Sequence, residues 1–82
     1  MLEDEFTIKV GLKVKQLRAE RNITQLQLAD KCDMEKNNIG RIENGRRNIK
    51  LFTLARICMA LDTNMSDFLK DFDLDKPDEN SY

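Results

Sequence analysis

The segment ITQLQLADKCDMEKNNIGRIENG, residues 23–45, contains the clearest local signals in the chain, and the rest of the architecture follows from it. Thr24 and Gln27 match a capping box, in which each side chain satisfies a free backbone N–H in the first turn of a helix. Ile23 and Leu28 have the spacing of the hydrophobic staple that brackets such a start. A helix is therefore predicted to begin at Thr24.

This helix is short and is followed closely by a second one. It runs to about residue 31, only about two turns, so it needs tertiary packing to be stable. A break at residues 32–34 leads to a helix at about 35–44, which Gly45 ends as a left-handed C-cap. Two short helices joined by a turn of about three residues form the helix-turn-helix unit, which lays its second helix in the major groove of DNA.

The remaining sequence predicts further helices and no strand. β-branched residues are sparse compared with Leu, Lys, Glu, Arg and Met, and no alternating apolar run is bounded by turn residues. Apolar side chains recur at helical spacing in residues 7–20, 49–61 and 64–72. We therefore expect an all-α domain of about five helices, in which residues 24–31 and 35–44 form the helix-turn-helix.

Asparagine residues mark several ends of these predicted helices. Asn22 tolerates the left-handed conformation that closes a helix, while Asn48 and Asn64 are predicted N-caps. The side chains expected to face the core from the last two helices are Leu51, Leu54, Ile57, Cys58, Leu61, Met65, Phe68 and Leu69.

The chain has 82 residues, of which 40% are hydrophobic, enough for one compact core and too little for a large enzyme cleft. The domain is predicted at residues 7–72, between an acidic extension (1–6) and a disordered acidic tail (73–82). The sequence has no run of about 18 apolar residues and no signal or transit peptide, so a cytoplasmic location is expected.

Metal or disulfide stabilisation is not expected. The sequence has no histidine, and Cys32 and Cys58 lack the paired spacing of a zinc site. We expect both cysteines to be reduced core residues rather than a disulfide. No cofactor is predicted.

Charge is distributed unevenly, although the net charge is only -1. Residues 9–56 hold twelve Lys and Arg against five acids, whereas residues 1–8 and 57–82 are acidic. A basic body between acidic ends suits a polyanion partner, although a solvated mixed surface is the alternative explanation.

The helix predicted at 35–44 has two different faces. Ile39 and Ile42 point toward the core, and the outer face has no acid. Asn can bond adenine at two positions, and Lys and Arg match guanine, so this face has the chemistry of a base-reading surface. A solvated polar face is the competing interpretation. Gly40 costs about 1 kcal/mol in mid-helix, which suggests that another surface approaches there. The outer residues are Lys36, Asn37, Gly40, Arg41 and Asn44.

The sequence also resembles a known family. QLRAERNITQLQLADKC, IGRIENGRRN and LFTLARICMAL occur in order within residues 10–69, and this run resembles the lambda-repressor-like, Cro-repressor/Xre-type helix-turn-helix family. Small members include phage repressors, controller proteins of restriction-modification systems and antitoxins, so the resemblance implies a prokaryotic or phage-encoded, nucleoid-associated protein.

The resemblance implies roles for individual residues. Arg18 and Glu43 match a buried ion pair that links the first helix to the third. Asp33 stands where the family usually has glycine, and Glu35 where a Ser or Thr cap is usual, so Asp33 is an alternative cap from which the helix would begin early. The implied base-reading residues are Lys36, Asn37, Asn38 and Arg41, and the implied phosphate contacts are Thr24, Gln25, Asn44 and Arg46, with Arg47 added by proximity.

The helix at 49–61 has more apolar surface than one core face requires. Phe52, Ala55 and Met59 form a second stripe, and Leu12 is similarly out of place on the first helix. Extra packing beneath Phe72 would explain the stripe. The alternative, which we favour, is a homodimer interface that includes Phe52, Ala55, Met59 and Phe72, because dimers commonly read two half-sites about 34 Å apart.

Together these features predict a sequence-specific transcriptional regulator that binds double-stranded DNA as a homodimer on a partly palindromic operator. An enzyme is not expected, because no nucleophile and base share a recognisable spacing. The alternatives are an antitoxin that neutralises a partner protein and a non-specific architectural protein. RNA polymerase or a toxin would be further partners.

Overall fold

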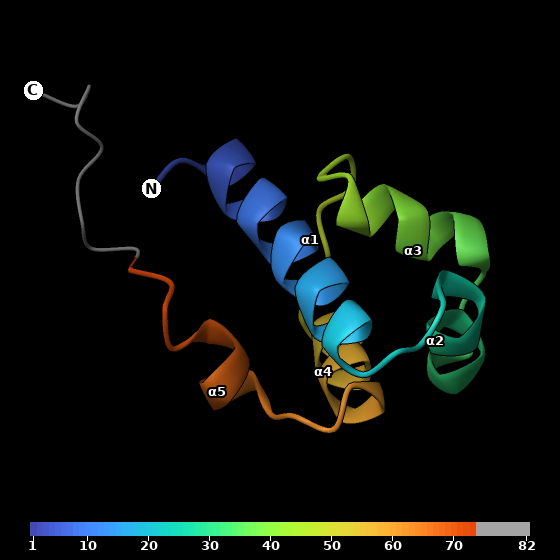
Figure 1. Ribbon diagram of the computed structural model, residues 1–82. Helices are drawn as coiled ribbons and strands as arrows, with labels where there is room; N and C mark the ends of the chain where they lie inside the picture. The colour runs from blue at the N-terminus through green and yellow to red at the C-terminus, as the bar shows by residue number, and fades with distance from the viewer. Residues whose placement is uncertain (74–82) are drawn as a thin grey trace, which may run out of the picture.

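The computed structural model describes residues 1–73, which form helices and no strand (Figure 1). The predicted all-α class is confirmed. Among the described residues, no helix combines the length and the apolar character that a membrane span requires. Residues 1–73 form five helices, which are α1 (Glu3–Glu20), α2 (Gln25–Cys32), α3 (Lys36–Glu43), α4 (Leu51–Ala60) and α5 (Met65–Leu69).

The helices surround one apolar core. α1 packs against α3, α2 packs against α3 and α4, and α4 packs against α5. Figure 1 shows α2 and α3 next to each other on one side of α1, with the short turn between them. Cys32 and Cys58 are free and buried, as predicted, and burial raises the pKa of both thiols. The buried apolar residues are Val10, Val14, Leu28, Ala29, Cys32, Ile39, Ile42, Leu54, Ile57, Cys58, Leu61 and Phe68.

The crossing of α1 and α3 depends on Gly11. A Cβ atom at Gly11 would lie 2.1 Å from the carbonyl oxygen of Ile42 and 3.0 Å from that of Glu43. Both obstacles are backbone atoms of α3, which no change of side-chain rotamer can move. The backbones of the two helices therefore approach so closely that only glycine fits at this position.

Helix starts follow the predicted caps in two places. The capping box is present: the hydroxyl oxygen of Thr24 accepts from the N–H of Gln27 at 3.0 Å, and the N–H of Thr24 donates to Oε1 of Gln27 at 2.8 Å. At α5, Oδ1 of Asn64 accepts from the N–H of Asp67 at 2.8 Å. Both caps depend on residues three apart, which is why the local sequence predicts them.

Four residues with left-handed backbone follow the ends of α1 to α4: Asn22, Asp33, Gly45 and Asp62. The predictions for Asn22 and Gly45 are confirmed. Asp33 takes this conformation at φ 53°, so it closes α2 and does not cap the next helix. The N-cap of α3 is Glu35, whose side chain makes no capping hydrogen bond. The alternative in which Asp33 caps an early start of α3 is therefore wrong.

The predicted start of the first helix is wrong by four residues. α1 begins at Glu3 rather than at Thr7, so most of the supposed acidic extension is helical. Three acids, Glu3, Asp4 and Glu5, form its first turn, where the positive end of the helix dipole favours negative charge. The acids that suggested a separate extension thus help to start the helix.

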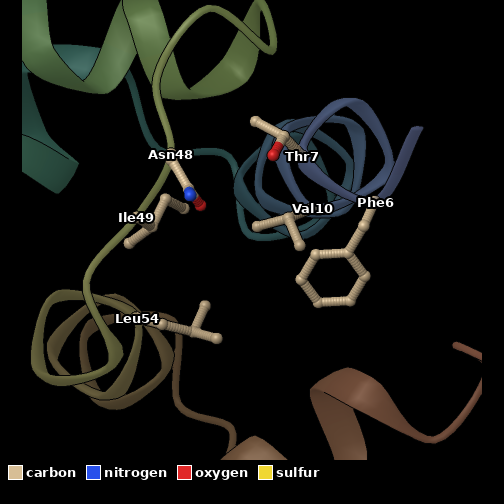
Figure 2. A pocket seen from close by; sticks show the side chains of 6 residues that line it. All are labelled: Phe6, Thr7, Val10, Asn48, Ile49 and Leu54. Carbon is tan, nitrogen blue, oxygen red and sulfur yellow. The ribbon is translucent and has the colours of Figure 1, made fainter. Parts of the chain in front are cut away.

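The predicted start of α4 is also wrong. Its N-cap is Lys50 rather than Asn48. Figure 2 shows the side chain of Asn48 between α1 and the segment that leads to α4, beside a small pocket. Leu51, predicted to face the core, is 73% exposed, because it stands in the first turn of α4, where no described side chain covers it. The pocket is lined by Phe6, Thr7, Val10, Asn48, Ile49 and Leu54.

Helix α5 ends at Leu69, three residues before the predicted end. Phe72 then packs within the chain: its ring centroid lies 5.4 Å from that of Phe6 and 6.1 Å from that of Phe68. Phe72 thus connects α5 to the beginning of α1. The predicted disordered tail, apart from Asp73, lies outside the described residues.

Candidate nucleic-acid interface

The outer face of α3 forms a shallow depression together with the start of α2. Lys36, Asn37 and Arg41 of α3 are exposed here, and none of the described residues that line the depression is acidic. Ile39 and Ile42 are buried on the opposite face, as predicted. The depression therefore presents cationic and amide groups to an approaching molecule. Its lining residues are Gln25, Lys36, Asn37, Gly40, Arg41 and Asn44.

Gly40 lies within this depression and is not required by the packing of the chain. A Cβ atom at Gly40 would meet only the amide nitrogen and oxygen of Gln25, each at 3.9 Å, which is an ordinary contact. Gly40 therefore differs from Gly11, whose neighbours are backbone atoms. The cost of a mid-helix glycine, about 1 kcal/mol, has no compensation inside the described chain.

The start of α2 borders the depression. Thr24 uses its hydroxyl oxygen and its N–H in the capping box, so its remaining polar group toward a phosphate is the hydroxyl proton. Gln25 is the first residue of α2 and lines the depression. Its Nε2 donates to Oε1 of Glu43 at 3.1 Å.

A buried ion pair lies beneath this surface. Nε of Arg18 donates to Oε2 of Glu43 at 2.7 Å, and a second nitrogen of Arg18 donates to Oε1 at 3.1 Å. Side-chain exposure is only 16% for Arg18 and 2% for Glu43. The hydrogen bond that Arg18 donates to Glu43 raises the pKa of the Arg18 guanidinium, so the arginine stays charged. The pair implied by the family resemblance is thus formed between α1 and α3.

The other implied contact residues are Asn38, in the first turn of α3, and three residues that follow its C-terminal end. Nη1 of Arg47 donates to Oδ1 of Asn38 at 2.6 Å, so this arginine is held against α3. Asn44 and Arg46 are exposed at the end of the helix. Asn38 is the one implied base-reading residue whose side chain already has a partner within the described chain, and this partner was not predicted.

Two residues of the apolar stripe on α4, Phe52 and Met59, are exposed, whereas Ala55 is half-buried. Phe52 is 73% exposed and Met59 is 77% exposed. The guanidinium of Arg56, between them on the same helix, lies 5.9 Å from the Phe52 ring centroid. The alternative that Phe72 covers the stripe is wrong, because Phe72 packs against Phe6 and Phe68 instead.

The sequence of the chain is similar to that of known proteins. A sequence model of the helix-turn-helix family matches residues 14–68. The immunity repressor protein of Bacillus phage phi105 is 34% identical over 73 residues, which are 89% of this chain and 51% of the repressor. The chain thus spans about half the length of that repressor. Control protein C.MunI of a Mycoplasma species is 31% identical over 71 residues, 85% of this chain and 96% of that protein.

A solved structure extends this similarity to the fold. The restriction-modification controller protein C.Esp1396I, crystallised as a tetramer in complex with its natural 35-base-pair operator, has 30% sequence identity and a TM-score of 0.74. The match covers 78% of this chain and 84% of the controller chain. The similarity therefore includes both the helix-turn-helix and the helices that pack against it.

Proposed function

Because the chain belongs to the helix-turn-helix family, we propose that it is a sequence-specific transcriptional regulator that binds a partly palindromic operator as a homodimer. The main support is the acid-free depression formed by α2 and α3. The similar proteins are an immunity repressor and control proteins, which favour a regulator over an antitoxin. In this proposal the protein acts in the prokaryotic cytoplasm, needs no cofactor and catalyses no reaction.

The proposed base-reading residues lie along α3. Asn37 would pair with adenine, while Lys36 and Arg41 would pair with guanine in the major groove. Asn38 would also read a base if its side chain released Arg47 and formed hydrogen bonds to a base edge instead. A contact from RNA polymerase or a toxin is not needed for this recognition.

The proposed phosphate contacts lie on both sides of this reading face. They set the position of the protein on DNA but do not select the sequence. Gln25 stands at the N-terminus of α2, where backbone N–H groups and the helix dipole favour an anion. The full proposed set is Thr24, Gln25, Asn44, Arg46 and Arg47.

Selection of bound sequences from a random pool of DNA duplexes tests the proposal directly. We expect an inverted repeat whose half-sites are about one helical turn apart, or a multiple of it. A non-specific architectural protein would enrich no sequence and would bind all duplexes with the same steep salt dependence.

Arg41 and Arg46 provide a matched pair of substitutions. Arg41→Ala is expected to cost about 1–3 kcal/mol on the selected site and little on other duplexes, because a base contact is lost. Arg46→Ala removes the same charge but is expected to weaken binding to all duplexes equally and to lower the salt slope by about 1. Fluorescence anisotropy at several salt concentrations measures both. Equal effects of the two substitutions on specificity would contradict the assigned roles.

Gly40→Ala should change stability and binding in opposite directions. Alanine at this helical position is expected to raise the free energy of unfolding by about 1 kcal/mol, since its Cβ meets only Gln25 at 3.9 Å. The same methyl group would stand between α3 and the bases and weaken operator binding. Urea unfolding and anisotropy measure the two effects. A stabilised protein with unchanged operator affinity would show that DNA does not approach this part of α3.

A further inference from the structure

We propose that Glu43 is a positioning residue for operator recognition, which fixes the orientation of the Gln25 amide at the DNA-facing surface. The inference rests on the proposed function, because it concerns the same surface. Counted over the whole residue, Glu43 is only 4% exposed, so it does not reach DNA. It acts through the side chain of Gln25.

The geometry places three donors around one carboxylate. Arg18 supplies two of them, at 2.7 Å and 3.1 Å, and Nε2 of Gln25 supplies the third, at 3.1 Å. These groups come from α1, from the start of α2 and from the end of α3. Glu43 therefore joins the two helices of the helix-turn-helix unit at the point where Gln25 reaches the surface.

The chemistry of the carboxylate selects one orientation of the amide. An ionised carboxylate can only accept hydrogen bonds, so the amide nitrogen of Gln25 must face Glu43. The amide oxygen and the second N–H of Gln25 are then left for the depression, which Gln25 also lines. A phosphate oxygen is an acceptor, and this second N–H is the group that can bind it. Without Glu43, rotation of the amide by 180° would exchange donor and acceptor at the surface.

Arg18 keeps the carboxylate in place. Its Nη1 donates to the backbone oxygen of Ile23 at 2.9 Å, immediately before the capping box of α2. Arg18 thus holds Glu43 and the start of α2 together with one guanidinium. Such an arrangement lowers the cost of ordering Gln25 when DNA binds, because the amide is oriented in advance.

A double-mutant cycle separates positioning from a purely structural role. Glu43→Gln can both donate and accept, so it no longer selects the orientation of Gln25. We expect it to weaken operator binding about tenfold, which is about 1.4 kcal/mol. In a Gln25→Met background, which has no amide to orient, we expect the same substitution to change affinity by less than about twofold. An equal loss in both backgrounds would overturn the proposal.

Loss of Glu43 leaves Arg18 buried without its partner and lowers stability, so a second variant is needed. Arg18→Met with Glu43→Met removes both charges, and replacement of a buried ion pair by apolar residues is often tolerated. We expect this double substitution to reduce operator affinity when Gln25 is present and to leave it nearly unchanged in the Gln25→Met background. Gln16→Met is the matched control for Gln25→Met. Gln16 also donates to a glutamate, Glu20, at 3.2 Å, but it is exposed on α1.

Side-chain amide NMR of the free protein tests the orientation without DNA. The two Nε2 protons of Gln25 are expected to have well-separated shifts and slowed exchange, and to approach free-glutamine behaviour in Glu43→Gln. Unchanged Gln25 signals in that variant would overturn the proposal. If the wild-type protein selects no DNA sequence, the proposed function fails, whatever the NMR result.

Discussion

Gly11→Ala is expected to lower the free energy of unfolding by at least about 4 kcal/mol, a large part of the total stability of a small domain. The added methyl group would lie 2.1 Å from a backbone oxygen of Ile42, so α1 and α3 would have to separate. Separation would open the core beside Val10 and Val14 and would stretch the ion pair that joins the two helices. Urea unfolding at 25 °C measures the change.

Gly40→Ala is the control for this prediction. It makes the same substitution inside another helix of the same protein, where the new methyl group meets only a flexible amide at 3.9 Å. The two variants should therefore differ in the sign of their effect as well as in its size. If Gly11→Ala unfolded at the same urea concentration as the wild type, the close crossing of α1 and α3 would be refuted.

A comparison of the helix ends with Gly11 shows what the sequence can and cannot predict. Helix ends such as those at Thr24, Asn22 and Gly45 depend on residues a few positions away, so local patterns were sufficient. Gly11 depends on a backbone atom of Ile42, far along the chain, and no periodicity indicates such a contact. Local reasoning therefore predicts which helices form better than it predicts how closely they pack.

The same distinction applies to the candidate interface. The outer face of α3 follows from helical spacing alone, and the depression contains the five residues assigned to that face. The bonds from Arg47 to Asn38 and from Gln25 to Glu43 join separate segments. A sequence pattern shows which polar groups share a face, but it does not show which of them already have partners.

The apolar stripe on α4 is the surface that best fits a second copy of the chain. Leu51, also 73% exposed, adds to Phe52 and Met59 and was not included in the predicted stripe. Exposed apolar side chains that lie together on one helix mark interaction sites more often than isolated ones do. Two copies related by a twofold axis would cover the stripe on both and would present two recognition helices to one operator.

Phe52→Glu is accordingly expected to convert a homodimer into a monomer, because the twofold symmetry would bring two new carboxylates into an apolar contact. Operator affinity should fall at least about 100-fold, since each half-site would then be bound without help from the other. Binding to a duplex with a single half-site should be nearly unchanged, because α3 is not altered. Sedimentation velocity at micromolar concentration and anisotropy on both duplexes measure these effects.

Leu12→Glu is the control for this prediction, because Leu12 is also apolar and 57% exposed but lies on α1. It should leave dimer and affinity intact. A Phe52→Glu protein that still sedimented as a dimer would place the interface elsewhere, and a monomer with full operator affinity would refute dimeric recognition.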